Sequence, residues 1–270
     1  MFYIKHHKND IWTGHFSMFP ESVATCAVST RLGGVSAAPY ASLNLALHVG
    51  DDAAAVRENR NRFCAALGLD ARAIVTPEQV HGDVIYQAKR EDAGRGSMSY
   101  DDAIKGTDAL MTNESGLPLM LCYADCTPIV MLDPVHHAAA VAHGGWKGTV
   151  SLIAAKTIAA MGEAYGTRPE DVLVGIGPAI GPCCYEVGND VAARFDDVFA
   201  DDAKKIVSVV NGKKHVNLWA ANKAQLVKAG VLPEHIDAAD VCTSCNHELF
   251  YSYRAESGKT GRIASIIALK

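Results

Sequence analysis

The chain is organised around one segment, LMLCYADCTPIVMLDPVHHAAAVAHGGWKGT, from Leu119 to Thr149. It contains three apolar runs of strand length, at 119–123, 128–132 and 138–141, and Asp133-Pro134 lies between the last two. Apolar runs of this length are typical of strands, and Asp-Pro is typical of a turn. The segment therefore predicts a hairpin or a closely spaced pair of strands.

Two side chains with reactive chemistry stand where these runs end. Cys126 follows Asp125 at a bend, and His143 comes at the end of a predicted strand, directly before two glycines. Small residues allow a ligand or another backbone to come close. A thiol and an imidazole at neighbouring strand ends can converge on one point, where they act as metal ligands or as nucleophile and base.

His81 adds a second imidazole, between two predicted strands and directly before a glycine. With Cys126 and His143 it makes up the donor set of a zinc site that keeps its fourth position open. The same set matches the equatorial ligands of a blue-copper site, so zinc and copper are alternatives. The 11 histidines include no His-x-His pair, which argues against a multicopper oxidase.

Composition limits the class of protein. The chain has 270 residues, of which 49% are hydrophobic and 20% charged, and its net charge is −5. It has no basic block, so we expect no nucleic-acid partner. No apolar window is long enough for a membrane span and the N-terminus lacks a signal pattern, so we expect no membrane partner and a cytoplasmic location. The eight cysteines are then reduced thiols or metal ligands.

The order of predicted elements indicates an α/β protein with a mixed sheet, in one domain over residues 1–270. Strands outnumber helices and do not alternate with them regularly, which disfavours a doubly wound sheet. Further strands are expected at 23–29, 74–80, 84–87, 107–112, 172–176, 236–241, 250–253 and 263–268. Helices are expected for about 15 residues after Asp51-Asp52, and at about 149–165, 190–199 and 217–229.

Two connecting segments receive specific predictions. Residues 40–50 are predicted to be extended, which would place Asn44 and His48 on one face because side chains alternate along a strand. Residues 91–100 (EDAGRGSMSY) are predicted to form a mobile loop, because they are polar and contain glycine.

Other candidate sites are weaker. Arg31 lies in a glycine-bearing loop and is either a surface residue or an anion clamp, since a guanidinium matches phosphate bidentately. Cys242-x-x-Cys245 predicts a tight turn with partly buried thiols. The adjacent pair Cys183-Cys184 could complete a metal site with it in space, although neighbouring cysteines seldom bind one ion together.

Seven segments, in order along the chain from about Ser29 to Arg262, resemble the laccase-domain family, formerly called multicopper polyphenol oxidases. They are TRLGGVS with PYASLNLALHVGDD, TPEQVHGDVI, GTDALMT, CYADCTPIVMLDP, AVAHGGWKGTV, GIGPAIGPCCYEV, and CT-x-C followed by FYSYRAESGKTGR. Seven ordered matches are far more specific than any single motif. One departure is Lys147, where the family often has arginine.

The resemblance implies a single domain of stacked mixed sheets flanked by helices, and zinc bound by His81, Cys126 and His143. It implies phosphorolysis of adenosine, inosine and 5′-methylthioadenosine to the free base and a ribose 1-phosphate derivative, with adenosine deamination as a further activity. The expected partners are thus a purine nucleoside and phosphate. The family motifs that border the pocket point to Arg31, Asn44 and His48 as substrate-binding residues.

Two other functions fit the same residues. In a cysteine hydrolase, Cys126 would be the nucleophile and His143 the base. In a copper-dependent phenol oxidase, the three ligands would bind copper instead of zinc.

Overall fold

The three apolar runs of the central segment are strands, but they belong to two different sheets. The structure is a computed structural model that describes residues 1–270. In it, β6 (Leu119–Tyr123) lies in one sheet, whereas β7 (Thr127–Asp133) and β8 (Ala138–Gly144) form an antiparallel hairpin in another. The hairpin with its Asp133-Pro134 turn is as predicted. Cys126 lies where the chain crosses between the sheets.

The first sheet has five antiparallel strands in the order β1-β2-β3-β14-β6. Its remaining strands are β1 (Phe2–His6), β2 (Trp12–Phe16), β3 (Ala24–Ser29) and β14 (Ile263–Leu269). The two N-terminal strands were not predicted, since histidines and lysines interrupt their apolar pattern. Tertiary pairing outweighs local preference there.

The second sheet has six strands in the order β13-β9-β7-β8-β5-β4 and is mixed, because its two outer pairs are parallel and its inner pairs antiparallel. Its other strands are β4 (Ile85–Gln87), β5 (Ala109–Thr112), β9 (Leu173–Ile176) and β13 (Ile236–Ala238).

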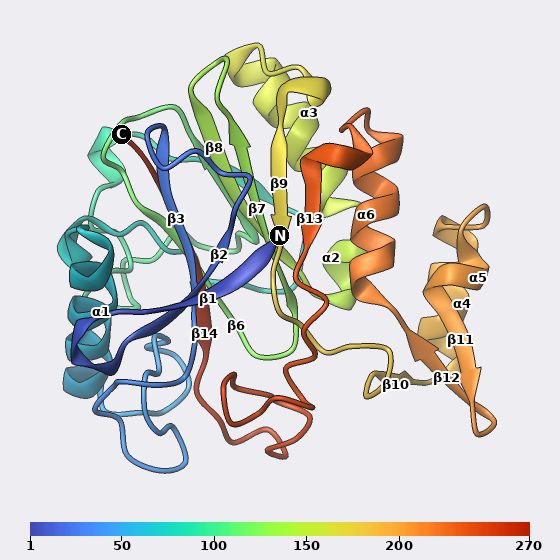
Figure 1. Ribbon diagram of the computed structural model, residues 1–270, viewed down its shortest axis with the longest axis horizontal. Coiled ribbons are helices and arrows are strands. Elements are labelled where there is room, and N and C mark those ends of the chain that lie inside the picture. The colour runs from blue at the N-terminus through green and yellow to red at the C-terminus, as the bar shows by residue number, and fades with distance from the viewer.

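Helices cover the outer faces of both sheets (Figure 1). They are α1 (Ala53–Leu67), α2 (Trp146–Val150), α3 (Ile153–Tyr165), α4 (Asn189–Val198), α5 (Ala203–Ile206) and α6 (Leu218–Lys228). Asp52 caps α1 by accepting a hydrogen bond from the Ala54 amide, and Gly68 ends this helix with φ +71°. Both boundaries follow the prediction. The predicted helix at 149–165 is instead divided into α2 and α3 at Leu152, whose φ is +62°.

Three apolar clusters join four layers, in the order helix, sheet, sheet, helix. Phe63 of α1 packs with Met120 of β6 on the outer face of the five-stranded sheet. Leu121 and Val130 belong to the cluster between the two sheets. Ile129, on the opposite face of β7, packs with α3 and α6. The central strands of both sheets, such as β6, β7, β8 and β14, are therefore buried on both faces, which explains their continuous apolar runs. The layers confirm the expected class of stacked sheets flanked by helices.

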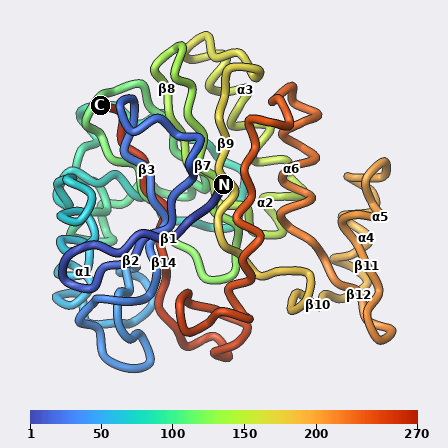
Figure 2. The backbone as a smooth tube through the Cα atoms, in the orientation of Figure 1, coloured from blue at the N-terminus to red at the C-terminus, as the bar shows by residue number.

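A third, small sheet projects beside α6 (Figure 2). It has the order β10-β12-β11 and consists of β10 (Glu186–Val187), β11 (Val207–Val210) and β12 (Lys213–Val216). With α4 and α5 it forms the outlying edge of the molecule. No helix of the structure has the length and apolarity needed to cross a membrane.

Several local predictions were wrong. Residues 40–50 contain bends and a turn at 47–48 but no strand, and Leu43, Asn44 and Leu45 are all buried, so the segment has no alternating faces. Residues 74–80 and 250–253 also lack strands, apart from isolated bridges in the first segment. The loop at 91–100 is anchored at one point, because the buried Arg60 guanidinium donates to the carbonyls of Gly96 and Ser97 at 2.6 Å, and its mobility stays a prediction.

Candidate metal centre and cavity

His81, Cys126 and His143 converge from three separate parts of the chain. His81 lies in the loop before β4, Cys126 lies between β6 and β7, and His143 lies near the end of β8. Their ligand atoms all lie within 4.8 Å of one another. His143 is opposite Pro128 in the β7–β8 register, so the hairpin itself holds the imidazole close to the thiol.

Asp108 organises this cluster from behind. Its carboxylate accepts hydrogen bonds from the backbone amides of Val80, His81 and Gly82 at 2.7–3.1 Å, and it pairs with Nδ1 of His143 at 2.8 Å. The bond to Nδ1 leaves Nε2 of His143 free for a ligand. A carboxylate behind a histidine in this way fixes the ring of a metal-binding imidazole.

The backbone around the cluster is shaped to bring the three side chains together. His81 has φ +60° and Asp125 has φ +79°, a left-handed conformation that side chains seldom adopt. A Cβ atom at Gly145 would lie 3.1 Å from the Cys126 sulfur and 3.3 Å from the His81 ring. Glycine at this position therefore leaves room for the donors, which a side chain would crowd.

Cys126 and His143 shift each other toward their charged forms. Burial disfavours the Cys126 thiolate, but the imidazoles of His143 and His81 outweigh this effect and lower the pKa of Cys126 to about 6. Burial also disfavours the His143 imidazolium, yet Cys126 and Asp108 raise the pKa of His143 to about 9. A half-buried thiolate with two imidazoles is the donor set that borderline-soft metal ions prefer. The three residues thus fit a metal ion.

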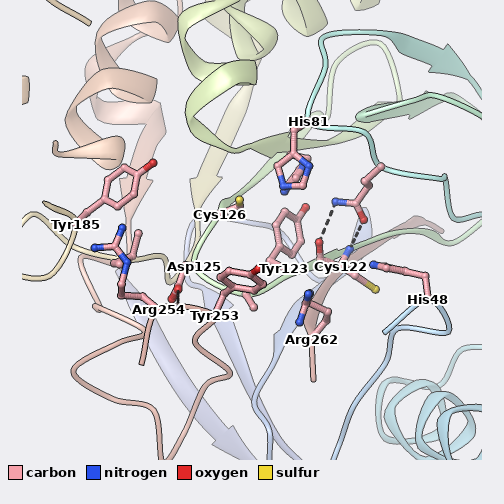
Figure 3. Close-up of a pocket in the computed structure, with 14 residues that line it drawn as sticks. His48, His81, Cys122, Tyr123, Asp125, Cys126, Tyr185, Tyr253, Arg254 and Arg262 are labelled. Carbon is pink, nitrogen blue, oxygen red and sulfur yellow. Dashed lines mark hydrogen bonds between the residues drawn. The ribbon is translucent and has the colours of Figure 1, made fainter. Parts of the chain in front are cut away.

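The cluster opens into a cavity of about 470 Å³. Tyr185 and Arg254 lie on one side of Cys126, and His48 lies on the other (Figure 3). The guanidinium carbon of Arg254 lies 5.6 Å from the centre of the Tyr185 ring, and that of Arg262 lies 5.8 Å from the centre of the Tyr253 ring. The cavity therefore combines metal-binding atoms, aromatic rings and positive charge, which suits an anionic or polar substrate with a flat ring.

Comparisons with known proteins show the family to which this chain belongs. The family model described as multi-copper polyphenol oxidoreductase laccase matches residues 25–270. The chain belongs to this laccase family. It is 38% identical over 249 residues to purine nucleoside phosphorylase YlmD of Geobacillus stearothermophilus, covering 92% of this chain and 91% of that protein. It is 36% identical over 252 residues to purine nucleoside phosphorylase YfiH of Escherichia coli, covering 93% and 95%.

The laccase-family fold extends over almost the whole chain. The crystal structure of the hypothetical protein YfiH of Bacillus licheniformis superposes with a TM-score of 0.89 at 38% identity, covering 92% of this chain and 93% of that one. The resemblance that the seven motifs indicated is therefore confirmed, for the family and for the fold class.

Of the three substrate-binding residues predicted for this laccase-family chain, one lines the cavity and two do not. His48 lines the cavity, whereas Arg31 and Asn44 do not. Arg31 pairs with Glu256 at 3.0 Å, donates to the carbonyl of Ala41 and lies over the Tyr251 ring. Its charge is thus already balanced.

Asn44 is fully buried and has a supporting position behind the cavity. Its side-chain amide donates to Asp51 at 2.9 Å, and its Oδ1 accepts from the backbone amide of Arg262 at 2.9 Å. Asn44 therefore holds the backbone at Arg262, directly before β14, and the side chain of Arg262 lines the cavity.

Sequence reasoning missed Asp108, Arg254 and Arg262, and also Tyr185 and Tyr253, two of the tyrosines that line the cavity. Asp108 lies inside GTDALMT, and Arg254 and Arg262 lie inside FYSYRAESGKTGR, so both motifs contained the signal. Two features could have indicated these residues. Asp108 is an acid directly before a buried strand, and the two arginines lie in a segment rich in glycine and aromatic residues.

Proposed function

We propose that this protein is a purine nucleoside phosphorylase whose reaction takes place in the cavity beside His81, Cys126 and His143. The observation that carries the proposal is the combination of this metal-binding set with two cavity arginines that have no carboxylate partner. The names of the relatives, purine nucleoside phosphorylase in both bacteria above, support the same reaction.

The phosphate is proposed to bind at Arg262, assisted by Arg254. Arg262 is half-buried, and its guanidinium donates only to the carbonyls of Thr260 and Gly261. It makes no ion pair, so its charge is available for an anion, which a guanidinium can bind through two parallel hydrogen bonds. Arg31, for which the sequence left a surface role and an anion clamp open, pairs with Glu256 and donates to the carbonyl of Ala41 in the adjacent loop.

The nucleoside is proposed to bind against the cavity tyrosines. Tyr185 and Tyr253 offer aromatic surfaces on which a purine can stack. His48 lies at the same cavity, and burial, reinforced by the charges of Arg262 and Arg60, lowers its pKa to about 4. His48 is therefore neutral at pH 7 and can exchange hydrogen bonds with ribose hydroxyls without adding charge.

The metal is proposed to be zinc, with copper as the alternative. A blue-copper site usually adds a weak axial methionine or glutamine. No methionine lines the cavity, and both side-chain polar atoms of Gln79 are bonded to the backbone of Cys122. When bound by His81, Cys126 and His143, zinc would act as a Lewis acid and would lower the pKa of a bound water toward 7.

In phosphorolysis, an oxygen of phosphate forms a bond to the anomeric carbon of ribose while the bond from that carbon to the purine nitrogen breaks. Positive charge develops on the ribose and negative charge on the departing base. Arg262 would hold the phosphate against the anomeric carbon, and this placement lowers the barrier by orienting the reactants. Adenosine, inosine and 5′-methylthioadenosine are the proposed substrates, and adenosine deamination is a proposed side activity.

A matched set of variants tests the proposal. Cys126→Ala should abolish phosphorolysis without loss of folding, because it removes the thiolate donor. Arg262→Gln should raise the KM for phosphate by roughly 10- to 100-fold, as expected for loss of a charged hydrogen bond. Arg72→Gln, an exposed arginine remote from the cavity, is the control and should leave the KM unchanged. Full activity of Cys126→Ala would overturn the proposal.

A cysteine hydrolase is the second candidate, because Cys126, His143 and Asp108 are also arranged as nucleophile, base and orienting carboxylate. The two candidates differ in their need for metal. Hydrolysis by metal-free protein, blocked by alkylation of Cys126, would favour the hydrolase. Loss of turnover on chelation, with recovery on adding zinc, would favour the phosphorylase.

A further inference from the structure

Four cysteines outside the cavity cluster come together at one edge of the six-stranded sheet. β9 and β13 are parallel neighbours, so the segments that follow them leave the sheet at the same edge. The segment after β9 carries Cys183 and Cys184, and the turn after β13 carries Cys242 and Cys245. A bridge between Ala179 and Cys242 fixes the two segments side by side. From the sequence alone, a shared metal site for these thiols was considered but disfavoured, because neighbouring cysteines seldom bind one ion together.

The spacing of the four sulfur atoms is that of a tetrahedral metal site. All four lie within 4.8 Å of one another, with Cys184 to Cys245 at 3.4 Å and Cys183 to Cys245 at 3.6 Å. Four sulfurs placed at about 2.3 Å from a zinc ion are about 3.8 Å apart. A disulfide would need about 2 Å, and all eight cysteines are free.

Backbone groups are already directed at one of these sulfurs. The amides of Gly181 and Cys245 donate to the sulfur of Cys242 at 3.2 and 3.5 Å. A Cβ atom at Gly181 would lie 3.1 Å from that of Cys242 and 2.9 Å from the Trp219 ring, so this close approach depends on glycine. Hydrogen bonds of this kind support metal-bound thiolates and orient them.

We propose that Cys183, Cys184, Cys242 and Cys245 bind a second, structural zinc ion. Four thiolates fill a tetrahedral shell and leave no position for substrate, which distinguishes this closed site from the three-donor set in the cavity. The ion can reach this site from solvent, because Cys183 and Cys245 are exposed.

The second site would fasten two walls of the cavity to each other. Cys184 is followed by Tyr185, and the Arg254 guanidinium donates to the carbonyls of Cys184 and Glu186 at 3.2 and 3.1 Å. On the other side, Thr243 bonds to Asp125, the neighbour of Cys126, at 2.7 Å. The zinc would thus hold the loop that bears Tyr185 against the turn that anchors Asp125. This inference does not depend on which reaction the cavity performs.

Metal analysis of variants tests the inference, with each protein purified under reducing conditions, supplied with zinc and desalted. The wild type should retain two equivalents of zinc. His81→Ala/Cys126→Ser, which removes two cavity donors, should retain one. Cys242→Ser/Cys245→Ser should lose one equivalent, whereas Cys26→Ala, a matched change of a buried thiol elsewhere, should lose none. A cavity variant that retains no zinc would overturn the inference.

Thiol protection in the wild type provides a measurement that needs no variant to fold. In the zinc-loaded protein, Cys183 and Cys245 should resist alkylation despite their exposure, and they should become reactive as zinc is released to a chelator. Rapid alkylation of both residues in zinc-loaded protein would contradict the inference. So would an intact mass that lacks two hydrogens per cysteine pair, because it would show disulfides in place of the ion.

Discussion

At the scale of single residues, the charge environment of a side chain decides its role more than its neighbours in sequence do. Arg31 and Arg262 both lie near glycines in family motifs, and nothing local separates them. Glu256 neutralises Arg31, while Arg262 faces the cavity without a carboxylate partner. The three proposed ligands were predictable because each has distinctive chemistry. The arginines were not, since their pairing depends on contacts between distant segments.

Asp108 provides a prediction at this scale. Asp108→Asn keeps the shape of the side chain but removes the charge that orients His143 and receives three amides of the His81 loop. Loss of such a supporting carboxylate should weaken zinc binding in the cavity by roughly 10- to 100-fold. Competition with a chromophoric chelator measures this change. To isolate the cavity ion, the titration is performed in the Cys242→Ser/Cys245→Ser background.

Asp133→Asn is the matched control. Like Asp108, Asp133 is a buried carboxylate that pairs with a histidine, in this case His136 at 2.8 Å. It lies at the far end of the β7–β8 hairpin, away from the cavity. This variant should bind zinc as the parent does. Unchanged zinc affinity in Asp108→Asn would show that the carboxylate does not support the site.

At the scale of elements, capped helices and buried strands were predictable, whereas their partners were not. Asp52 and Gly68 mark the ends of α1 through local hydrogen bonds and a left-handed residue, both of which depend on neighbours in sequence. The separation of β6 from β7 depends instead on β14, which pairs with β6 from the opposite end of the chain. The break at Leu152 is also hidden, since leucine is a good helix former.

The β7–β8 turn yields a prediction of pH dependence. Burial of Asp133 would raise its pKa, but hydrogen bonds from the His136 and Val135 amides and from the His136 ring outweigh burial and hold the pKa below its usual value. A lowered folded-state pKa means that this carboxylate stabilises the fold above the usual carboxylate range. That stabilisation is lost as the pH falls through the folded-state pKa.

Urea unfolding at several pH values measures this effect. At pH 7, Asp133→Asn should lower the free energy of unfolding by about 1–3 kcal/mol, as expected for hydrogen bonds to a charged group. The difference between wild type and variant should shrink as the pH falls below about 4. A difference that stays constant down to low pH would mean that ionised Asp133 does not stabilise the turn.

At the scale of the whole molecule, the site exists because two sheets are stacked closely and Cys126 lies at the crossing between them. The sequence predicted strands and an α/β class, and the seven motifs indicated the stacked arrangement. The contacts that set the distance between the sheets come from residues far apart in sequence. Phe16 of β2 and Gly175 of β9 make one such contact, and the sequence around each residue gives no sign of it.

Gly175→Ala tests this packing. The added Cβ would lie 2.5 Å from the Phe16 ring, so the sheets must shift apart or the ring must move. The substitution should lower the free energy of unfolding by about 1–3 kcal/mol, as is typical of overpacked cores. Adding Phe16→Leu to make room should recover part of this loss. Equal stability of Gly175→Ala and wild type would show that the interface between the sheets has room for an added methyl group.

Phosphorolysis in the cavity can be tested by chromatography of the products that metal-analysed protein forms from adenosine, with and without phosphate. Adenine and ribose 1-phosphate should form in the presence of phosphate only, and any inosine or hypoxanthine should arise through the deaminase side activity. Full zinc occupancy with no turnover of adenosine, inosine or 5′-methylthioadenosine would contradict the proposed phosphorolysis.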